Sequence, residues 1–275
     1  MRIAIQGYEG SFHQIVAESC FGREAGIIPC DTFREVARRV KSGEAAFGVM
    51  AVENSIAGTI IANYGILQEA GVQVAGEYYL RIVQNLVALP GTRLEDITEV
   101  ESHPMALQQC HNFLDTHPDW RLVESEDTAL SARRVAEKGL GTTAAIASES
   151  AARLYGLEIV APEINTIKNN HTRFVIIKVQ DLLIAPDANK ASLYFKTDHS
   201  PGSLVRALGV LDGVNMSRLQ SHPIPAEPWH YMFHIDLEFP SLDIYAANLE
   251  RLVRATEEVH VYGVYPSGLK KNDNI

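Results

Sequence analysis

The sequence predicts a two-lobed α/β domain followed by a smaller α+β domain. Up to residue 179, apolar runs of strand length alternate with segments of helical spacing, which is typical of a largely parallel sheet with helices on its faces. From residue 191 the predicted order becomes strand, helix, strand, strand, helix, strand, the ferredoxin-like arrangement. Between them, residues 181–190 contain proline and several polar residues, so we place the boundary near residue 185.

Local signals support each element of the first lobe. Ser11 is suited to cap a helix, and Thr32 with Glu35 forms a capping-box pair. The continuous apolar run 47–52 is typical of a buried parallel strand, and Gly71 ends a helix. The predicted elements are a strand at 2–6 with a turn at 7–10, helices from 11 to about 21 and from 33, a strand at 47–52, and a helix at 60–69.

The second lobe repeats the alternation of strands and helices. The strand-rich stretch 72–89 is expected to pass between the two lobes. The elements that follow are helices at 104–116 and 128–138 and strands near 98–102, 120–124, 143–147 and 173–179. Pro104 in the first turn and His103 just before it mark the start of the first of these helices.

The C-terminal domain has one helix with a strong signal. Ser241 can cap it, and its apolar residues share one face: Leu242, Tyr245, Leu249, Leu252 and Val253. The predicted elements are strands at 191–197, 214–221, 229–238 and 258–264 and helices at 201–211 and 242–255.

Composition narrows the class of protein. The 275 residues suffice for one large or two ordinary domains, and no run approaches the length of a membrane span. The net charge of -10 argues against a nucleic-acid partner or an anionic membrane, and an anionic substrate would need a local positive site. The N-terminus lacks the features of a signal peptide, and three cysteines without metal spacing fit reduced thiols. We therefore expect a cytoplasmic protein.

Two polar clusters stand at the ends of predicted strands. Asn169–Phe174 comes directly before the apolar run 175–177, and Glu53–Ser55 directly follows the run 47–52. Strand ends are where α/β proteins tend to hold their ligands. Two such clusters in one domain predict a shared cleft.

Other motifs carry less information. The turn Gly7–Ser11 could aim backbone N–H groups at an anion, but it lacks the third glycine of a dinucleotide site and the lysine of a P-loop. The spacing of Cys110, His111, Asp115 and His117 matches no common metal site, so we read them as a solvated helix face. No metal is predicted.

Six motifs follow one another along the chain: Gly7–Phe12, Val52–Gly58, His103–Cys110, Asp127–Ala129, Ala144–Ser148 and Asn170–Phe174. Taken in this order they resemble the prephenate dehydratases, and the match spans residues 1 to about 180. The C-terminal unit resembles the ACT regulatory domain that follows the catalytic part in that family.

This resemblance implies a function and a domain plan. The function is conversion of prephenate to phenylpyruvate, with loss of water and carbon dioxide, in phenylalanine biosynthesis, and it requires no cofactor. The catalytic domain would be 1–180, with two lobes like a periplasmic binding protein and the site in their cleft. Lobe one would be about 1–80 plus 160–180, lobe two about 81–159, and the ACT domain 190–275. A homodimer or homotetramer is expected.

The resemblance makes Thr172 the catalytic hydroxyl. Strand alternation then points Phe174 to the same side, toward the substrate, and Arg173 to the other, where it would brace the lobe, with Glu53 as its candidate partner. A threonine is a weak acid, so we expect Thr172 to donate a hydrogen bond to the departing oxygen. The candidate carboxylate donors are Ser11, Asn54, Ser55 and Ser148.

Two segments of the C-terminal unit match those that bind the inhibitor phenylalanine at the dimer interface in the family. They are Gly202, Ser203, Leu204 and Val205, and Gln220, Ser221, His222 and Pro223. The second segment departs from the family's Glu-Ser-Arg-Pro, since Gln220 and His222 replace the acid and the arginine. A histidine, unlike arginine, loses its charge near neutral pH, so an ion pair at His222 would weaken as pH rises.

Three alternatives remain open. An arogenate dehydratase would act on the amino acid in place of the keto acid, and the sequence does not separate the two. A two-lobed amino-acid sensor without catalysis would not need Thr172. A structural scaffold linked to an ACT domain would explain neither strand-end cluster.

Overall fold

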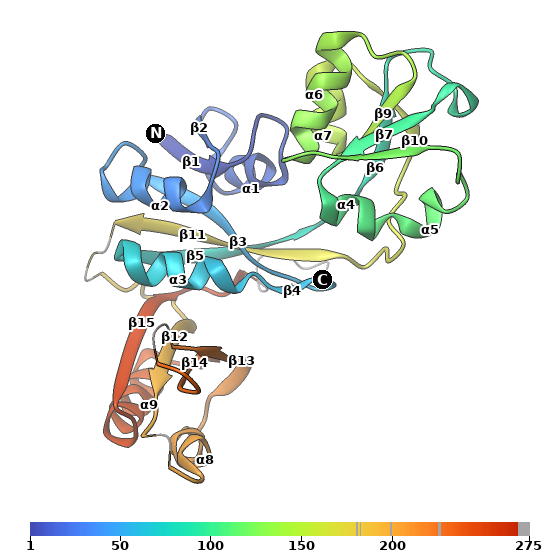
Figure 1. Ribbon diagram of the computed structural model, residues 1–275. Coiled ribbons are helices and arrows are strands. Elements are labelled where there is room, and N and C mark those ends of the chain that lie inside the picture. Colours follow the sequence, from blue (N-terminus) through green and yellow to red (C-terminus); the bar gives the residue numbers. More distant parts are fainter. Residues whose placement is uncertain (180, 182, 199, 225–226, 269–275) are drawn as a thin grey trace. The chain divides into compact units, whose positions relative to one another are not determined.

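The first sheet has six strands in the order β2-β1-β3-β11-β5, with β4 paired to β3 (Figure 1). The structure is a computed structural model that describes residues 1–268 except 180, 182, 199 and 225–226. β1 pairs in parallel with β2 and β3, as the buried apolar run of β3 predicts. The strands are β1 (Arg2–Gln6), β2 (Gly26–Cys30), β3 (Phe47–Asn54), β4 (Gly58–Thr59), β5 (Val72–Arg81) and β11 (His171–Val179).

The helices of this lobe begin where the caps predict. They are α1 (Phe12–Phe21), α2 (Phe33–Lys41) and α3 (Ile61–Ala70). Ser11 Oγ accepts the N–H of Gln14 at 3.4 Å, and Thr32 Oγ1 accepts that of Glu35 at 3.2 Å. The capping box is only half formed, because the Glu35 carboxylate accepts the N–H of Asp31, one residue before the cap.

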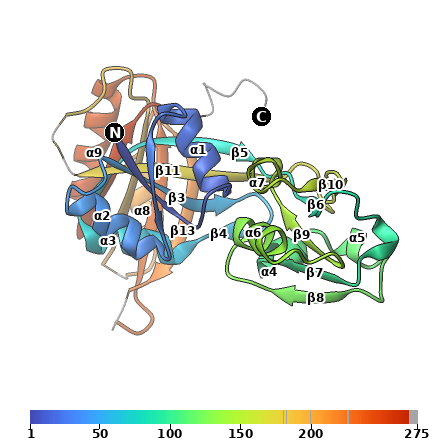
Figure 2. The ribbon, with the colours of Figure 1, turned by 90° about the horizontal axis from the view of Figure 1, so that it is seen from above.

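The second lobe is built on a five-stranded sheet in the order β10-β6-β9-β7-β8. Figure 2 shows β8, β7 and β9 side by side; β7 runs parallel to both neighbours, whereas β6 is antiparallel to β9 and β10. The strands are β6 (Asn85–Ala88), β7 (Glu99–Ser102), β8 (Arg121–Glu124), β9 (Thr143–Ala147) and β10 (Glu158–Ala161); the helices are α4 (Pro104–Gln109), α5 (His111–Leu114), α6 (Thr128–Lys138), α7 (Glu149–Tyr155) and a 3₁₀ turn, Leu94–Asp96.

Apolar packing covers both faces of this second sheet. Ile146 and Val100 pack with Leu107 in one cluster, and Ala145 packs with Val135 in the other. Alternate residues of β9 therefore serve opposite cores, as the two-residue period of a strand requires. Full burial of a side chain such as Val135 contributes about 1.5–3 kcal/mol.

Four elements were not predicted from the sequence, and one predicted helix is divided in the structure. β2, β4, α7 and β10 were not predicted; β2 is short and contains Pro29, and α7 and β10 are also short. The helix expected at 104–116 is two helices, because Cys110 has φ -110° and ψ 14°, outside the helical range. β11 begins at His171, so Thr172 lies within the strand.

The C-terminal sheet has four strands in the order β13-β14-β12-β15, all paired antiparallel. With α8 and α9 this is the predicted βαββαβ order. Leu204 of α8 and Leu252 of α9 pack in one cluster with Leu193 and Ile235 of the sheet. The elements are β12 (Lys190–Lys196), α8 (Ser203–Gly209), β13 (Asn215–Pro223), β14 (Tyr231–Glu238), α9 (Leu242–Ala255) and β15 (Glu258–Tyr265).

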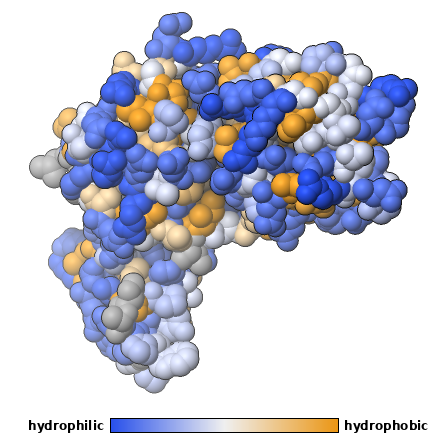
Figure 3. Space-filling model, turned by 45° about the horizontal axis from the view of Figure 1, so that its top comes forward, coloured by the Kyte–Doolittle hydropathy of each residue, from blue (hydrophilic) through white to orange (hydrophobic). Residues whose placement is uncertain are grey.

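The chain divides into two compact units, residues 1–60 with 79–174 and residues 61–78 with 175–275. Residue 182 of the predicted linker and residues 199, 225–226 and 269–275 of the predicted C-terminal domain lie outside the described residues. The face in Figure 3 mixes hydrophilic residues with small groups of hydrophobic ones. Within the described residues, no helix is long and apolar enough to cross a membrane, and no group of three or more His, Cys, Asp or Glu could hold a metal ion.

Candidate active site

A cavity of about 540 Å³ in the first compact unit joins the two predicted strand-end clusters. Asn54 from the end of β3 and Thr172 from the start of β11 both line it, so the expected shared cleft is present. The lining residues come from both lobes: Gln6, Ser11, Phe12, His13, Phe33, Ala51, Asn54, Ala57, Thr59, Ile60, Ile82, Gln84, His103, Met105, Ala106, Gln109, Glu126, Asp127, Thr128, Thr172 and Phe174.

A chain of side-chain amides holds Thr172. Asn54 Nδ2 donates to Thr172 Oγ1 at 2.9 Å and to Asn170 Oδ1 at 2.7 Å. Asn170 Nδ2 in turn donates to Oε1 of Gln109, on α4 of the other lobe, at 3.0 Å. Asn170 is fully buried, and Asn54 and Thr172 are 8% and 7% exposed. The threonine hydroxyl is therefore fixed by a network that spans both lobes.

The backbone determines the direction of these hydrogen bonds. Asn54 Oδ1 accepts the N–H groups of Ile56 at 3.0 Å and Ala57 at 2.9 Å, so the other end of the amide must be its nitrogen. That nitrogen donates to Thr172 Oγ1, which accepts. The Thr172 proton is then available for an acceptor in the cavity.

Strand alternation worked as predicted at β11. Thr172 and Phe174 line the cavity, whereas the buried Arg173 does not and lies 3.8 Å from the Glu53 carboxylate. The expected ion pair between Arg173 and Glu53 is present. The Phe174 ring meets the imidazole of His13 edge-on at 5.0 Å, and the Phe33 ring lies 5.4 Å from that imidazole. These three rings form an apolar wall.

The cavity contains no lysine or arginine among its described lining residues. The sequence led us to expect a local positive site, and the N-terminus of α1 is the nearest equivalent. The N–H groups of Phe12 and His13 lie in the first turn, where no intrahelical acceptor exists, and the helix dipole favours an anion there. The N-terminus of α6 is already capped, because Asp127 Oδ1 accepts the N–H groups of Ala129 and Leu130.

Acidic groups are also present. Asp127 lines the cavity, and burial raises the pKa of its carboxyl above the usual range. Burial lowers the pKa of His13 to about 3, so its imidazole is neutral at physiological pH. The cavity wall therefore combines a neutral imidazole and apolar rings with two acidic side chains, Glu126 and Asp127.

The four predicted carboxylate donors have separate positions. Ser11 lines the cavity and caps α1, and Asn54 lines it while holding Thr172. Ser55 is exposed and does not line the cavity; its Oγ accepts the N–H of His171 at 2.9 Å. Ser148 lies outside it too, because its hydroxyl donates to Gly10 O at 2.8 Å and caps α7. In this structure the hydroxyls of Ser55 and Ser148 therefore bond backbone atoms and do not line the cavity.

The Ser148 bond is part of a contact between the lobes. The turn Gly7–Ser11 of the first lobe lies against α7 of the second, and Tyr155 Oη donates to Glu9 O at 2.7 Å. A Cβ at Gly10, which has φ +86°, would lie 2.9 Å from the Ala151 Cα. Only glycine allows this approach.

Sequence reasoning missed several lining residues. Gln109 lies within the motif His103–Cys110 but is not itself predicted to line the site, and the sequence analysis assigns no role to His13 or Gln84. The α1 helix carries His13, and the segment between β5 and β6 carries Gln84, whose backbone N–H donates to Asn165 Oδ1 at 2.7 Å. The Gly-x-x-Gly turn ahead of α1 was the one signal that could have led to His13.

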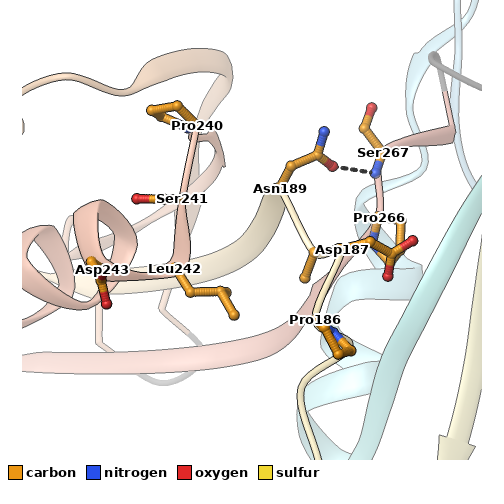
Figure 4. Close-up of a pocket in the computed structure, with 10 residues that line it drawn as sticks. Pro186, Asp187, Asn189, Pro240, Ser241, Leu242, Asp243, Pro266 and Ser267 are labelled. Atoms are coloured by element: carbon orange, nitrogen blue, oxygen red, sulfur yellow. Dashed lines mark hydrogen bonds between the residues drawn. The ribbon is translucent and has the colours of Figure 1, made fainter.

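A separate cavity of about 570 Å³ lies in the C-terminal unit (Figure 4). Its polar groups mainly hold loops: Asn189 Oδ1 accepts the N–H of Ser267 at 2.7 Å, and Ser241 Oγ caps α9. It brings together no set of groups suited to catalysis.

The two predicted phenylalanine segments lie on different elements of the C-terminal unit. Gly202 is the N-cap of α8 with φ +76°, Ser203 Oγ donates to Thr197 Oγ1 at 3.0 Å, and Leu204 packs on the core while Val205 is exposed. The second segment, Gln220, Ser221, His222 and Pro223, ends the sheet-edge strand β13.

Comparisons with known proteins identify the family of this chain. Residues 3–181 match the family described as prephenate dehydratase. The bifunctional chorismate mutase/prephenate dehydratase of Escherichia coli K12 is 33% identical, over 97% of this chain and 71% of that protein. A prephenate dehydratase from Arthrobacter aurescens in complex with L-Phe has a TM-score of 0.88 at 28% identity, over 98% of this chain and 91% of that one.

A structure described as a novel type of quorum quenching acylase also has a TM-score of 0.88, at 31% identity over 98% of this chain and 100% of that chain. The fold is thus similar to that of proteins described with different activities. The family match covers most of the chain and includes every residue that lines the cavity. By this match, the chain belongs to the prephenate dehydratase family.

Proposed function

We propose that this chain converts prephenate to phenylpyruvate, the activity for which its family is named. The observation that carries the proposal is the hydrogen bond that the Thr172 hydroxyl accepts from Asn54. Because the hydroxyl accepts this bond, its own O–H can donate to a group in the cavity. A donor fixed in this way suits a reaction in which a hydroxyl group leaves.

The chemistry needs little from the protein. The ring carboxylate leaves as carbon dioxide, its bonding electrons enter the ring, and the ring hydroxyl departs to leave an aromatic ring. One proton is taken up to complete the water. The hydrogen bond from Thr172 stabilises charge on the departing oxygen, and a positioned donor of this kind contributes about 10²–10⁴ in rate.

We assign roles to the surrounding residues on the same basis. Asn54 orients Thr172, and Ser11 with the first turn of α1 offers donors to a carboxylate. Phe174 packs beside the ring. Ser55 and Ser148 act as positioning residues, since their hydroxyls hold backbone atoms of His171 and Gly10.

Replacement of Thr172 by valine tests the proposal. Thr172→Val keeps the branched shape and removes the hydroxyl, so turnover of prephenate should fall about 10²–10⁴-fold while the melting temperature stays close to wild type. Thr172→Ser is the matched control and should keep most activity. Turnover in Thr172→Val close to that of the wild type would remove Thr172 from the mechanism.

Two other activities make different predictions. Arogenate carries an ammonium group where prephenate has a carbonyl, so comparing kcat/KM for the two substrates distinguishes them. The acylase likeness suggests amide hydrolysis. That reaction needs a base to activate the threonine, but Thr172 Oγ1 accepts its bond from an amide nitrogen. This geometry favours dehydration.

We also propose a catalytic domain at 1–180 and an ACT domain at 190–275 that binds phenylalanine between two chains of a homodimer or homotetramer. The βαββαβ order and the edge position of β13 support it. We further propose a cytoplasmic location, which the three free thiols support. Calorimetric titration with phenylalanine tests the regulatory part: no heat of binding would leave this domain with an assembly role.

A further inference from the structure

Two residues that line the active-site cavity each carry a buried polar atom without a hydrogen-bond partner among the described residues. The atoms are Nε2 of His13 and Oε1 of Gln84, and both are shielded from water. Both residues line the cavity. Buried polar atoms in native proteins are nearly always paired, so two unpaired atoms at one cavity call for an explanation.

Both side chains are held by rigid neighbours. The His13 imidazole lies in the first turn of α1, between the rings of Phe33 and Phe174. The Gln84 backbone is fixed on both sides, since its N–H donates to Asn165 Oδ1 and its carbonyl accepts the N–H of Ile164 at 2.8 Å. Their missing partners therefore do not result from loose loops.

We propose that His13 and Gln84 are neutral hydrogen-bond donors to the dianionic substrate, and that they replace the cation that the cavity lacks. The inference rests on the proposed function. Two carboxylates and a carbonyl make the substrate rich in acceptors, with a single hydroxyl as donor.

Each group can donate in its uncharged state. A neutral imidazole with its proton on Nε2 is a donor, and a half-turn of the Gln84 amide exchanges its oxygen for its NH₂ group. Burial lowers the pKa of His13 to about 3, which agrees with a neutral imidazole. Neutral donors avoid the cost of burying a cation before the substrate arrives.

Variants at His13 separate hydrogen bonding from ring packing. His13→Phe keeps a ring between Phe33 and Phe174 but removes the donor, whereas His13→Gln removes the ring and keeps a donor near the Nε2 position. We expect His13→Phe to raise KM for prephenate about three- to tenfold, the effect of one lost neutral hydrogen bond, and His13→Gln to stay within about twofold of wild type.

Gln84 provides an independent test. Gln84→Met keeps the length without hydrogen bonding and should raise KM to a similar extent, with kcat little changed. Gln84→Glu adds a negative charge beside the substrate and should raise KM more than Gln84→Met. If His13→Phe does not fold, judged by its thermal melting, the Gln84 pair still decides the proposal.

Binding of phenylpyruvate, measured by calorimetry on the full chain, gives a readout independent of turnover. His13→Phe and Gln84→Met should both weaken it. Wild-type values of KM and binding in His13→Phe and Gln84→Met, or a His13→Gln variant that folds yet binds worse than His13→Phe, would overturn the inference. Absence of prephenate turnover in the wild type would instead overturn the proposed function.

Discussion

Replacing Asn54 by aspartate should reverse the hydrogen bond that prepares Thr172. The change is nearly isosteric, and one carboxylate oxygen can still accept the N–H groups of Ile56 and Ala57. The other oxygen takes the place of Nδ2, so the Thr172 hydroxyl must turn and donate a hydrogen bond to the new carboxylate. The hydroxyl is then no longer available as a donor to the substrate.

The magnitudes follow from the contacts. The bonds that Nδ2 donates to Asn170 Oδ1 at 2.7 Å and to His171 O at 3.3 Å are lost, the 2.9 Å bond with Thr172 is reversed, and the new oxygen faces Asn170 Oδ1. We expect about 1–3 kcal/mol less free energy of unfolding. Turnover should fall about 10²–10⁴-fold, which corresponds to about 3–5 kcal/mol in the activation barrier.

The assay is prephenate turnover beside urea unfolding. Asn248→Asp is the matched control, because Asn248 is a buried amide whose Nδ2 donates to Asp212 O and Ile244 O at 2.8 Å in the C-terminal unit. It should lose stability to a similar degree and keep its kcat. Acidification should partly restore the turnover of Asn54→Asp, because a protonated carboxyl group can again donate a hydrogen bond to Thr172. If kcat of Asn54→Asp lies within about threefold of wild type, Asn54 does not orient Thr172.

Three further predictions concern packing and protonation. Ser148→Ala should lower the free energy of unfolding by about 1–2 kcal/mol through loss of a cap, with kcat/KM changed less than about threefold; a larger kinetic effect would return Ser148 to the substrate. Gly10→Ala should lower the melting temperature more than Gly22→Ala, because Gly22 has a similar φ but no atom within 4 Å of a new Cβ; equal shifts would contradict the close contact. The folded-state pKa of His13, about 3, lies below that of an unfolded histidine, so the free energy of unfolding should decrease as pH falls from about 6.5 toward 3, by up to about 1.4 kcal/mol per pH unit. In urea unfolding at several pH values, His13→Phe should lack this dependence. Parallel curves of unfolding free energy against pH for the two proteins would refute the prediction.

Local sequence patterns were enough to predict most of the secondary structure and part of the candidate site. The period of a strand is local, so the opposite orientations of Arg173 and Phe174 could be derived from their positions alone. Helix caps such as Ser11 and Ser241 could also be predicted, because the capping hydroxyl and the backbone N–H that donates to it lie three residues apart.

The roles of the polar side chains were not readable in this way. Asn54 was expected to bind a carboxylate, yet its donors go to Thr172, 118 positions away. Ser148 was expected at the substrate, yet its acceptor is Gly10, 138 positions away. A sequence shows which groups can donate, but the acceptor is decided by tertiary structure. For the same reason His13, a single histidine on a helix, could be linked to the cavity only through the Gly-x-x-Gly turn that precedes it.

The described residues that line the cavity include no lysine or arginine, which has a consequence for the end of the catalytic cycle. The substrate enters with two negative charges and the organic product leaves with one, because a carboxylate departs as carbon dioxide. A lysine or arginine would keep attracting the remaining charge. Neutral donors and a helix terminus lose a large part of their contacts when that carboxylate departs, so the wall that holds the substrate also favours release of the product.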